Sequence, residues 1–575
     1  MSKLSGGDPK TVFELLGDKK AYFFIPDYQR PYAWNKSECD TLWNDLFNFA
    51  FPNNDYTAFN SAKDEYFLGS IVTYLNQEKH EVIDGQQRIV TLMLLLRAFY
   101  NKFDNMQDEN SIASKKAIEQ CIWKTNEFGK PNINSLKLET EVAIDEARHE
   151  FQEILKTGKV FYEHKSLYAN NYRFFQEKVE DFLHNFGGYL AYFPMRILNN
   201  CIFLPITADS QETAMVIFST LNDRGKPLSD ADIFKAQLYK YYRDVLHRKD
   251  EFVQKWKEFE ELCSEIYHPK NATPMDEAFA RYMYYERAKL KIKDTTTTGI
   301  RKFYDSYAIF KKDKTFENII DLAKFWEAVS NLDEKFSERV LKRLFVLNYA
   351  PNDMWTNITS VYYLANRSDN GILDDEKFYN FLNKLTAFIW GYSFINPGVN
   401  ALRMPIYDAM IDIVEGKQIN FSKYKLDIQQ LTNAINNYVF SNNSAMTRPM
   451  LTWWALNNEK QKLLKLNEAF QIEHIYAKKR FEFEKGLTNP ANLDLLGNKS
   501  LLEKEINIRA ADYRFPDKVK YYKGEKGKKK EKTKIQDILE IIEKFTDFTE
   551  SDIVQRNALI IQRFIDYLKK NDLIK

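Results

Sequence analysis

The feature that most constrains the fold is a long stretch, residues 250–440, in which apolar residues recur at helical spacing with little glycine or proline punctuation. Such a pattern predicts consecutive amphipathic helices and no sheet. The chain of 575 residues is too long for one hydrophobic core, because single domains commonly span roughly 100–200 residues. We therefore expect an all-helical middle region that separates two modules of different pattern.

The N-terminal part alternates strand-like runs with helical segments. The strand candidates are short runs rich in aromatic and β-branched residues. The third of them is followed by an Asp-Gly turn pair and then by an apolar helical segment at residues 89–100. Strand, turn and helix in this order form a unit of an α/β domain. The predicted strands lie at residues 21–25, 67–74 and 81–83.

Residues 101–200 are mainly helical in pattern, and residues 201–206 are a further strand candidate. Ser229 can cap the next helix, with Asp232 at the third helical position. The apolar residues of that helix recur at helical spacing at Phe234, Leu238, Tyr241 and Val245. The predicted domains are residues 1–245, 246–444 and 445–575.

The run DGQQR at residues 84–88 is the first candidate site. Backbone N–H groups at the start of a helix attract anions, and Arg88 can bind phosphate oxygens with two N–H groups. Gln86 and Gln87 offer amide donors, and Asp84 can hold Mg²⁺ or orient water. Taken by itself, the run fits a turn with a polar helix cap better than a phosphate site.

The second candidate site surrounds His474. A strand ending in Glu473-His474, a second strand near residues 493–502 and a following helix would make a ββα unit. The ordinary pKa of histidine suits a general base for phosphodiester hydrolysis. Glu473 and Asn507 can bind a divalent metal, and Asn498 can hold the imidazole or the loop by hydrogen bonds.

A histidine beside a glutamate is, however, more often an ordinary surface or capping residue than a site. His474 is the only one of the seven histidines that follows His268, so no other imidazole competes for a catalytic role in the C-terminal half. The motifs around His474 decide how strongly the sequence supports a catalytic role for this residue.

The run at residues 496–507, followed by Phe515, Lys518 and the Tyr pair at 521–522, resembles the HNH-type nuclease module of the GmrSD family. This family comprises type IV, modification-dependent restriction enzymes. Ala477 stands where the family usually has proline, and Lys499 where it usually has leucine. The resemblance implies a general base at His474, an orienting amide at Asn498, and metal ligands at Glu473 and Asn507.

Three further runs resemble the N-terminal half of the same family, in the same order as DGQQR: IPDYQRPYAW at 25–34, FLGSIV at 67–72 and FSTLNDRGKPLS at 218–229. The resemblance implies a ParB/sulfiredoxin-like α/β fold that binds and hydrolyses a nucleoside triphosphate. The implied nucleotide site comprises Asp84, Gly85, Gln86, Gln87 and Arg88. Arg30, Asn222 and Arg224 are expected to complete that site or to face DNA.

Bulk properties set limits on other functions. Four scattered cysteines without a CxxC pair argue against a disulfide framework or a cysteine zinc site. No secretory signal or bilayer-spanning run is seen, so a cytoplasmic protein without membrane contact is expected. A net charge of +1 neither supports nor excludes DNA. Residues 518–534 carry nine lysines against two glutamates and fit a phosphate contact and a solvated loop equally well. Tyr28, Tyr32 and Trp34 fit packing better than base stacking.

The sequence thus predicts a mostly helical, multidomain α+β protein: a nucleotide-binding domain, a helical middle region and a ββα-metal nuclease. We expect an NTP-regulated DNA endonuclease of anti-phage defence that uses Mg²⁺ or Mn²⁺ and restricts modified or foreign DNA, such as phage DNA. A homo-oligomer is left open. Two alternatives remain: a DNA-binding NTPase switch with an inactive nuclease fold, and an effector that cleaves RNA such as tRNA.

Overall fold

The computed structural model describes eleven stretches of the chain, which divide into two units, residues 1–255 and 256–575. Among the described residues, no helix combines the length and the apolar character needed to cross a membrane. The four cysteines are free and buried. The described stretches are residues 5–6, 8–26, 29–142, 145–209, 213–214, 229–269, 272–312, 314–398, 400–465, 468–526 and 531–575.

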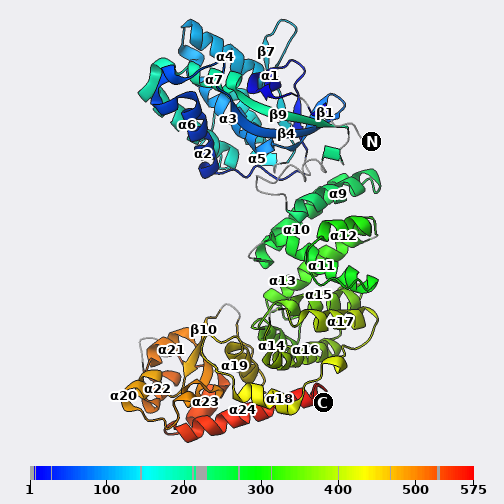
Figure 1. The fold of residues 1–575 in the computed structure, drawn as a ribbon, viewed down its shortest axis with the longest axis vertical. Coiled ribbons are helices and arrows are strands. Elements are labelled where there is room, and N and C mark those ends of the chain that lie inside the picture. The colour runs from blue at the N-terminus through cyan, green and yellow to red at the C-terminus, as the bar shows by residue number, and fades with distance from the viewer. Residues whose placement is uncertain are drawn as a thin grey trace. The chain divides into compact units, whose positions relative to one another are not determined.

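A mixed sheet of seven strands forms the centre of the first unit (Figure 1). Its order is β1-β9-β4-β5-β3-β8, and β2 also pairs with β9. Strands β5, β3 and β8 run parallel to one another, so the chain leaves all three at the same edge of the sheet. The strands are β1 (Ser5–Gly6), β2 (Lys10–Thr11), β3 (Phe23–Ile25), β4 (Tyr66–Asn76), β5 (Lys79–Asp84), β8 (Leu138–Thr140) and β9 (Cys201–Ala208). A separate pair comprises β6 (Trp123–Thr125) and β7 (Pro131–Leu136).

Helix α3 (Gln86–Lys102) is the buried helix of this unit and confirms the predicted strand, turn and helix. It is apolar on all sides, as expected for a helix covered by others, and it contacts α4, α5 and α6. The other helices are α1 (Val12–Leu16), α2 (Lys36–Ala50), α4 (Glu109–Ile122), α5 (Asp145–Thr157), α6 (Leu167–Phe186), α7 (Tyr192–Asn200) and α9 (Asp230–Asp244).

The start of α9 confirms the predicted cap. The Ser229 hydroxyl accepts a hydrogen bond from the Asp232 N–H at 3.1 Å, and the Asp232 carboxylate accepts one from the Ser229 N–H. The predicted apolar face is right at Phe234 and Leu238 but wrong at its end, because Tyr242 is buried in place of Tyr241 and Val245 is exposed.

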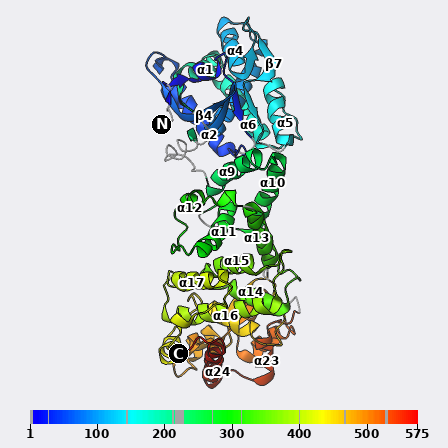
Figure 2. The same cartoon turned by 90° about the vertical axis from the view of Figure 1, so that its right-hand side faces the viewer.

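Helices alone form the regular structure of the described residues between α9 and 465, which confirms the predicted helical middle region. Figure 2 shows α11, α13, α15, α17 and α16 in successive layers. The mostly helical α+β class is confirmed, while the predicted domain boundaries stay predictions. These helices are α10 (Lys249–Ile266), α11 (Pro274–Leu290), α12 (Ile300–Ser306), α13 (Thr315–Ser330), α14 (Glu338–Leu347), α15 (Met354–Asn366), α16 (Asp375–Ile395), α17 (Arg403–Val414), α18 (Ile428–Asn436) and α19 (Thr447–Leu456).

The C-terminal part contains an antiparallel strand pair followed by a helix, in the predicted order. Strand β10 (Phe470–His474) pairs with β11 (Lys499–Glu503), and His474 lies opposite Lys499. The second strand is shorter than predicted, because the residues before it form short 3-10 turns. Helix α20 (Lys478–Glu484) lies between the two strands, and the helices after them are α21 (Lys504–Ala510), α22 (Phe515–Tyr522), α23 (Gln536–Lys544) and α24 (Glu550–Lys570).

Candidate functional site

The run at residues 84–88 lies where β5 ends and α3 begins. Gly85 has a φ of 90°, a left-handed conformation that glycine adopts readily, and this turns the chain into the helix. The Arg88 guanidinium donates from Nη1 to the carbonyl oxygen of Leu68 at 2.7 Å, and its Nη2 lies 3.8 Å from the Asp84 carboxylate. Burial raises the pKa of Asp84, and the charges of Arg88 and Arg30 oppose that rise. The structure therefore brings one acid and two guanidinium groups together at the sheet edge.

Gly69 on β4 makes room for Arg88. Its φ is 107°, and a Cβ atom at this position would lie 1.9 Å from Nη1 of Arg88. We missed this role from the sequence, although the glycine stands in the FLGSIV run that carries the family resemblance. Because the close neighbour is the guanidinium itself, any side chain at Gly69 must displace Arg88 from its described position.

Gln87 contacts the protein's own backbone. Its side-chain oxygen accepts a hydrogen bond from the Ala33 N–H at 2.7 Å, and its side-chain nitrogen donates to the Pro31 carbonyl at 3.1 Å. Both amide ends are thus engaged in fixing the chain that follows β3. A positioning role for Gln87 fits this geometry better than the predicted contact with a nucleotide.

Tyr32, in the same loop, is a packing residue, as the sequence favoured. Its ring stacks on Tyr168 at a centroid distance of 4.9 Å, and its hydroxyl lies 2.7 Å from the Thr91 hydroxyl and accepts from Asn171. Tyr28 lies outside the described residues.

Arg30 and Gln86 line a small cavity at this edge of about 10 Å³, room for about one water molecule. A nucleotide would therefore bind over this surface and not within the described cavity. The two remaining predicted residues, Asn222 and Arg224, lie outside the described residues.

His474 ends β10 beside a charged pair. Its Nε2 lies 3.9 Å from Oδ1 of Asp494, and the same carboxylate oxygen accepts from Nζ of Lys499 at 2.8 Å. Lys499 also donates to the Asn442 side chain at 3.0 Å and is fully buried, whereas the His474 side chain is 18% exposed. His474 and Lys499 thus both lie beside the Asp494 carboxylate, but of these two only the His474 imidazole is reachable from solvent.

Burial, followed by the charge of Lys499, lowers the pKa of His474 to about 4. The ordinary, near-neutral pKa expected from the sequence is therefore wrong for this residue. A histidine with this pKa is uncharged at pH 7 and can accept a proton, which a general base must do.

Glu473, next to it, faces the other side of the strand, as adjacent strand residues do. Its Oε1 accepts hydrogen bonds at 2.5 Å from both Nζ of Lys518 and the hydroxyl of Tyr522. Lys518 donates further to the His474 carbonyl oxygen at 2.6 Å. Glu473 and Lys518 are both almost fully buried, so they form an ion pair inside the module.

The donor set predicted for a metal does not fit a divalent cation in this arrangement. A cation bound by Glu473 would lie beside the Lys518 ammonium, and like charges repel strongly at short distance. The side-chain nitrogen of Asn507 donates to Gln471 at 2.8 Å. Across the part of the chain that the structure describes, no three histidine, cysteine, aspartate or glutamate side chains gather closely enough to hold a metal.

Asn498 holds the loop and not the imidazole. Its side-chain oxygen accepts from the Tyr476 N–H at 2.7 Å, and its side-chain nitrogen donates to the carbonyl oxygens of Tyr476 and Leu493. Of the two roles that the sequence left open for this residue, the structure shows the second. Asn498 thereby fixes the chain directly after His474.

The sequence assigned no role to two residues of this site: Asp494, which it did not single out, and Lys518, which it named only as part of the family resemblance. Asp494 stands in the NLDLLGN run, where a carboxylate between leucines was a usable signal. Lys518 is the first residue of the lysine-rich stretch, where a solvated side chain is expected. In the structure its side chain is only 1% exposed and pairs with Glu473.

Residues 12–239 match the family described as GmrSD restriction endonuclease, N-terminal domain. This part of the chain therefore resembles the N-terminal domain of the GmrSD family, and the similarity indicates a restriction-type defence nuclease. The match contains the DGQQR site and ends before His474. The chain is also similar to the uncharacterized protein MJ0686 of Methanocaldococcus jannaschii, with 23% identity over 87% of this chain and 84% of that protein.

Proposed function

We propose that this protein is a nucleotide-controlled DNA endonuclease that restricts modified or foreign DNA. The observation that carries the proposal is the match of residues 12–239 to a restriction endonuclease domain. The cluster around His474 adds the group that hydrolysis requires, an uncharged imidazole that solvent reaches. Arg88 of the DGQQR run and the nearby Arg30 add two guanidinium groups for a triphosphate.

In this proposal, His474 accepts a proton from the water that attacks the phosphodiester. Asp494, near the imidazole, stabilises the protonated form that results. Lys478, whose charge also contributes to the low pKa of His474, is exposed at the start of α20 and can bind the phosphate. Asn498 keeps the chain after His474 in place.

Mg²⁺ or Mn²⁺ remains part of the proposal only as an added reagent. Such an ion, when bound, would stabilise negative charge on the phosphate and the leaving oxygen. No step is assigned to it here, because Glu473 is already paired with Lys518. Cleavage in Mg²⁺, in Mn²⁺ and in EDTA measures the requirement directly.

The Glu473–Lys518 pair also favours the second candidate, a DNA-binding NTPase switch whose nuclease fold is inactive. The two candidates differ in one measurement. The full-length protein is incubated with modified and unmodified phage DNA, and with tRNA, in the presence and absence of each nucleoside triphosphate. Cleavage of DNA supports the DNA endonuclease. Cleavage of tRNA alone would mean that the substrate is RNA. NTP hydrolysis without cleavage of either nucleic acid supports the NTPase switch.

Changes around Arg88 test the nucleotide site. We expect Arg88→Ala to weaken NTP binding by about tenfold or more, because a guanidinium–phosphate contact is lost. Gly69→Ala should weaken it too, since the added methyl displaces the same guanidinium. The matched control is Gly129→Ala, where φ is also positive but nothing lies within 4 Å of the new Cβ. Binding that survives both site changes would contradict the nucleotide site.

Burial and, after it, the charge of Lys499 set the pH range of the proposed base. A lowered pKa keeps His474 uncharged down to about pH 4, so cleavage by wild type should not fall between pH 8 and pH 5. In Lys499→Met the pKa of His474 should rise towards its ordinary value of about 6.5. As the pH is lowered, activity of Lys499→Met should therefore begin to fall at a higher pH than that of wild type.

The pH profile of the cleavage rate is the measurement for this prediction, with Lys479→Met, an exposed lysine, as the control. A small shift is expected for that control, because solvent screens its charge. Identical profiles for wild type and Lys499→Met would show that His474 does not act as the base.

A further inference from the structure

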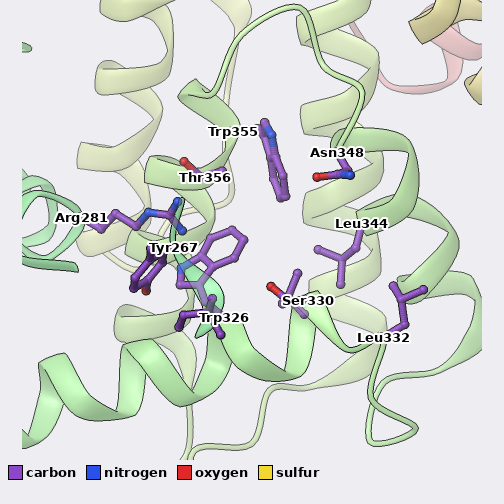
Figure 3. Close-up of a pocket in the computed structure, with 11 residues that line it drawn as sticks. Tyr267, Arg281, Trp326, Ser330, Leu332, Leu344, Asn348, Trp355 and Thr356 are labelled. Atoms are coloured by element: carbon purple, nitrogen blue, oxygen red, sulfur yellow. The ribbon is translucent and has the colours of Figure 1, made fainter. Parts of the chain in front are cut away.

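A cavity of about 210 Å³ lies within the helices of the second unit, away from both sites described above. Its walls come from α11, α13, α14, α15 and the end of α10. Figure 3 shows Arg281 entering from one side, with its guanidinium between Tyr267 and Trp326, and Trp355 on the far side of the cavity. Three large aromatic rings and one cation thus line the same space.

Neighbouring side chains hold Arg281 in place, but not all of its N–H groups have a hydrogen-bond partner among the described residues. Its guanidinium lies 4.7 Å from the ring centroid of Tyr267 and 4.4 Å from that of Trp326, while Nε donates to Glu277 at 2.8 Å. Its Nη1 is buried and has no hydrogen-bond partner among the described residues, and the same is true of the Tyr267 hydroxyl. Buried polar groups without partners are unfavourable. The geometry therefore leaves a donor available for an acceptor atom of a ligand.

The aromatic walls are fixed before any ligand binds. Trp326 donates from Nε1 to the Ser360 hydroxyl at 2.9 Å, and its ring meets that of Trp355 edge-on at a centroid distance of 5.4 Å. Both tryptophan residues are about 5% exposed. Rigid indole faces of this kind bind flat, unsaturated rings by stacking.

The rim carries an unusual backbone conformation. Leu332 follows α13 with a φ of 50°, in the left-handed region where glycine is the usual residue after a helix. A bulky side chain there is strained, and such strain gathers at binding sites. The exposed Asn348, at the end of α14, adds an amide to the same rim.

Charge and size select the ligand. Arg281 is the one charged residue among those that line the cavity, and Glu277 already compensates it. A phosphate would find little net positive charge here, so a neutral ligand is favoured. The volume is below the roughly 300–1,000 Å³ of pockets for drug-sized ligands, so one flat ring system fits and a sugar or phosphate would remain outside.

We propose that this cavity binds a single nucleobase, which stacks on one of the two tryptophan rings and accepts a hydrogen bond from Nη1 of Arg281. The inference rests on the proposed function in one respect: a protein that acts on DNA encounters nucleobases, which are flat rings that carry hydrogen-bond acceptors. The base comes either from a free nucleoside or from DNA, where it would be turned out of the helix.

Calorimetry of the full-length protein with each of the four common deoxynucleosides tests the free source. Fluorescence of 2-aminopurine in a short duplex tests the second source, because this base brightens when it leaves the stack. We expect binding in at least one arm and a loss of about tenfold or more in Arg281→Gln. Arg339→Gln is the matched control, since Arg339 is an exposed arginine of α14 paired with Asp375.

Ser330→Phe provides a second variant, which fills the cavity from an exposed rim position and leaves the buried polar groups intact. It should abolish binding even if Arg281→Gln fails to fold. No signal in either arm, or binding that is unchanged in Ser330→Phe, overturns the inference. His474→Ala should bind the base as wild type does, so loss of cleavage and loss of base binding are separate outcomes.

Discussion

His474→Ala is expected to lower the rate of DNA cleavage by about 10²–10⁴-fold, the range usual for removal of a general base. The imidazole of His474 is 18% exposed to solvent, and its low pKa keeps it unprotonated at pH 7, the form that a general base needs. NTP binding should be unchanged, because the DGQQR site lies in the other unit. Initial rates on phage DNA, at equal protein concentration, are the measurement.

The control for this prediction is His268→Ala, which removes an exposed imidazole from the helical region. It should cleave DNA at the wild-type rate. Equal rates for wild type and His474→Ala would mean that this cluster is not the nuclease centre. A fall in both variants would point to a loss of structure, which thermal unfolding of each protein would show.

Lys518→Met is expected to lower the free energy of unfolding by about 3–5 kcal/mol, because it leaves a buried carboxylate without its partner. Burial already raises the pKa of Glu473, and the charge of Lys518 is the strongest effect that lowers it. Without that ammonium the pKa should rise further, and Glu473 should take up a proton on folding. Urea unfolding followed by tryptophan fluorescence measures the loss.

Two further variants separate the ion pair from general damage. The double variant Glu473→Gln with Lys518→Met should recover part of the stability, since no charge is then left buried. Lys520→Met, on the same helix but exposed and paired with Asp517, should change stability by less than about 1 kcal/mol. If Lys518→Met is as stable as Lys520→Met, Lys518 is not held in a buried pair.

Much of the local structure could be predicted from the sequence. The turn after β5, the buried helix α3, the cap at Ser229 and the helical middle region all follow from short-range patterns. The extent of β11 did not follow, because residues 493–498 are held in turns by Asn498, a contact that no local pattern encodes.

The candidate sites divide in the same way. The sequence predicted both of them, because the order and spacing of acids, amides and guanidinium groups can be read directly from the chain. It assigned Gln87 to a ligand, whereas the fold uses both ends of that amide to hold the loop after β3. It listed Gly69 only as part of a motif, whereas the fold needs that position empty for Arg88.

Glu473 and His474 show most clearly what each level decides. Their order in the chain determined that a carboxylate and an imidazole would stand together at the end of a strand. Because neighbouring strand residues face opposite sides, only the tertiary structure decided that Glu473 meets Lys518 and that His474 lies beside Lys499 and Asp494. Burial and these distant lysines, not the local sequence, set the charge of each group and hence which of them can take part in chemistry.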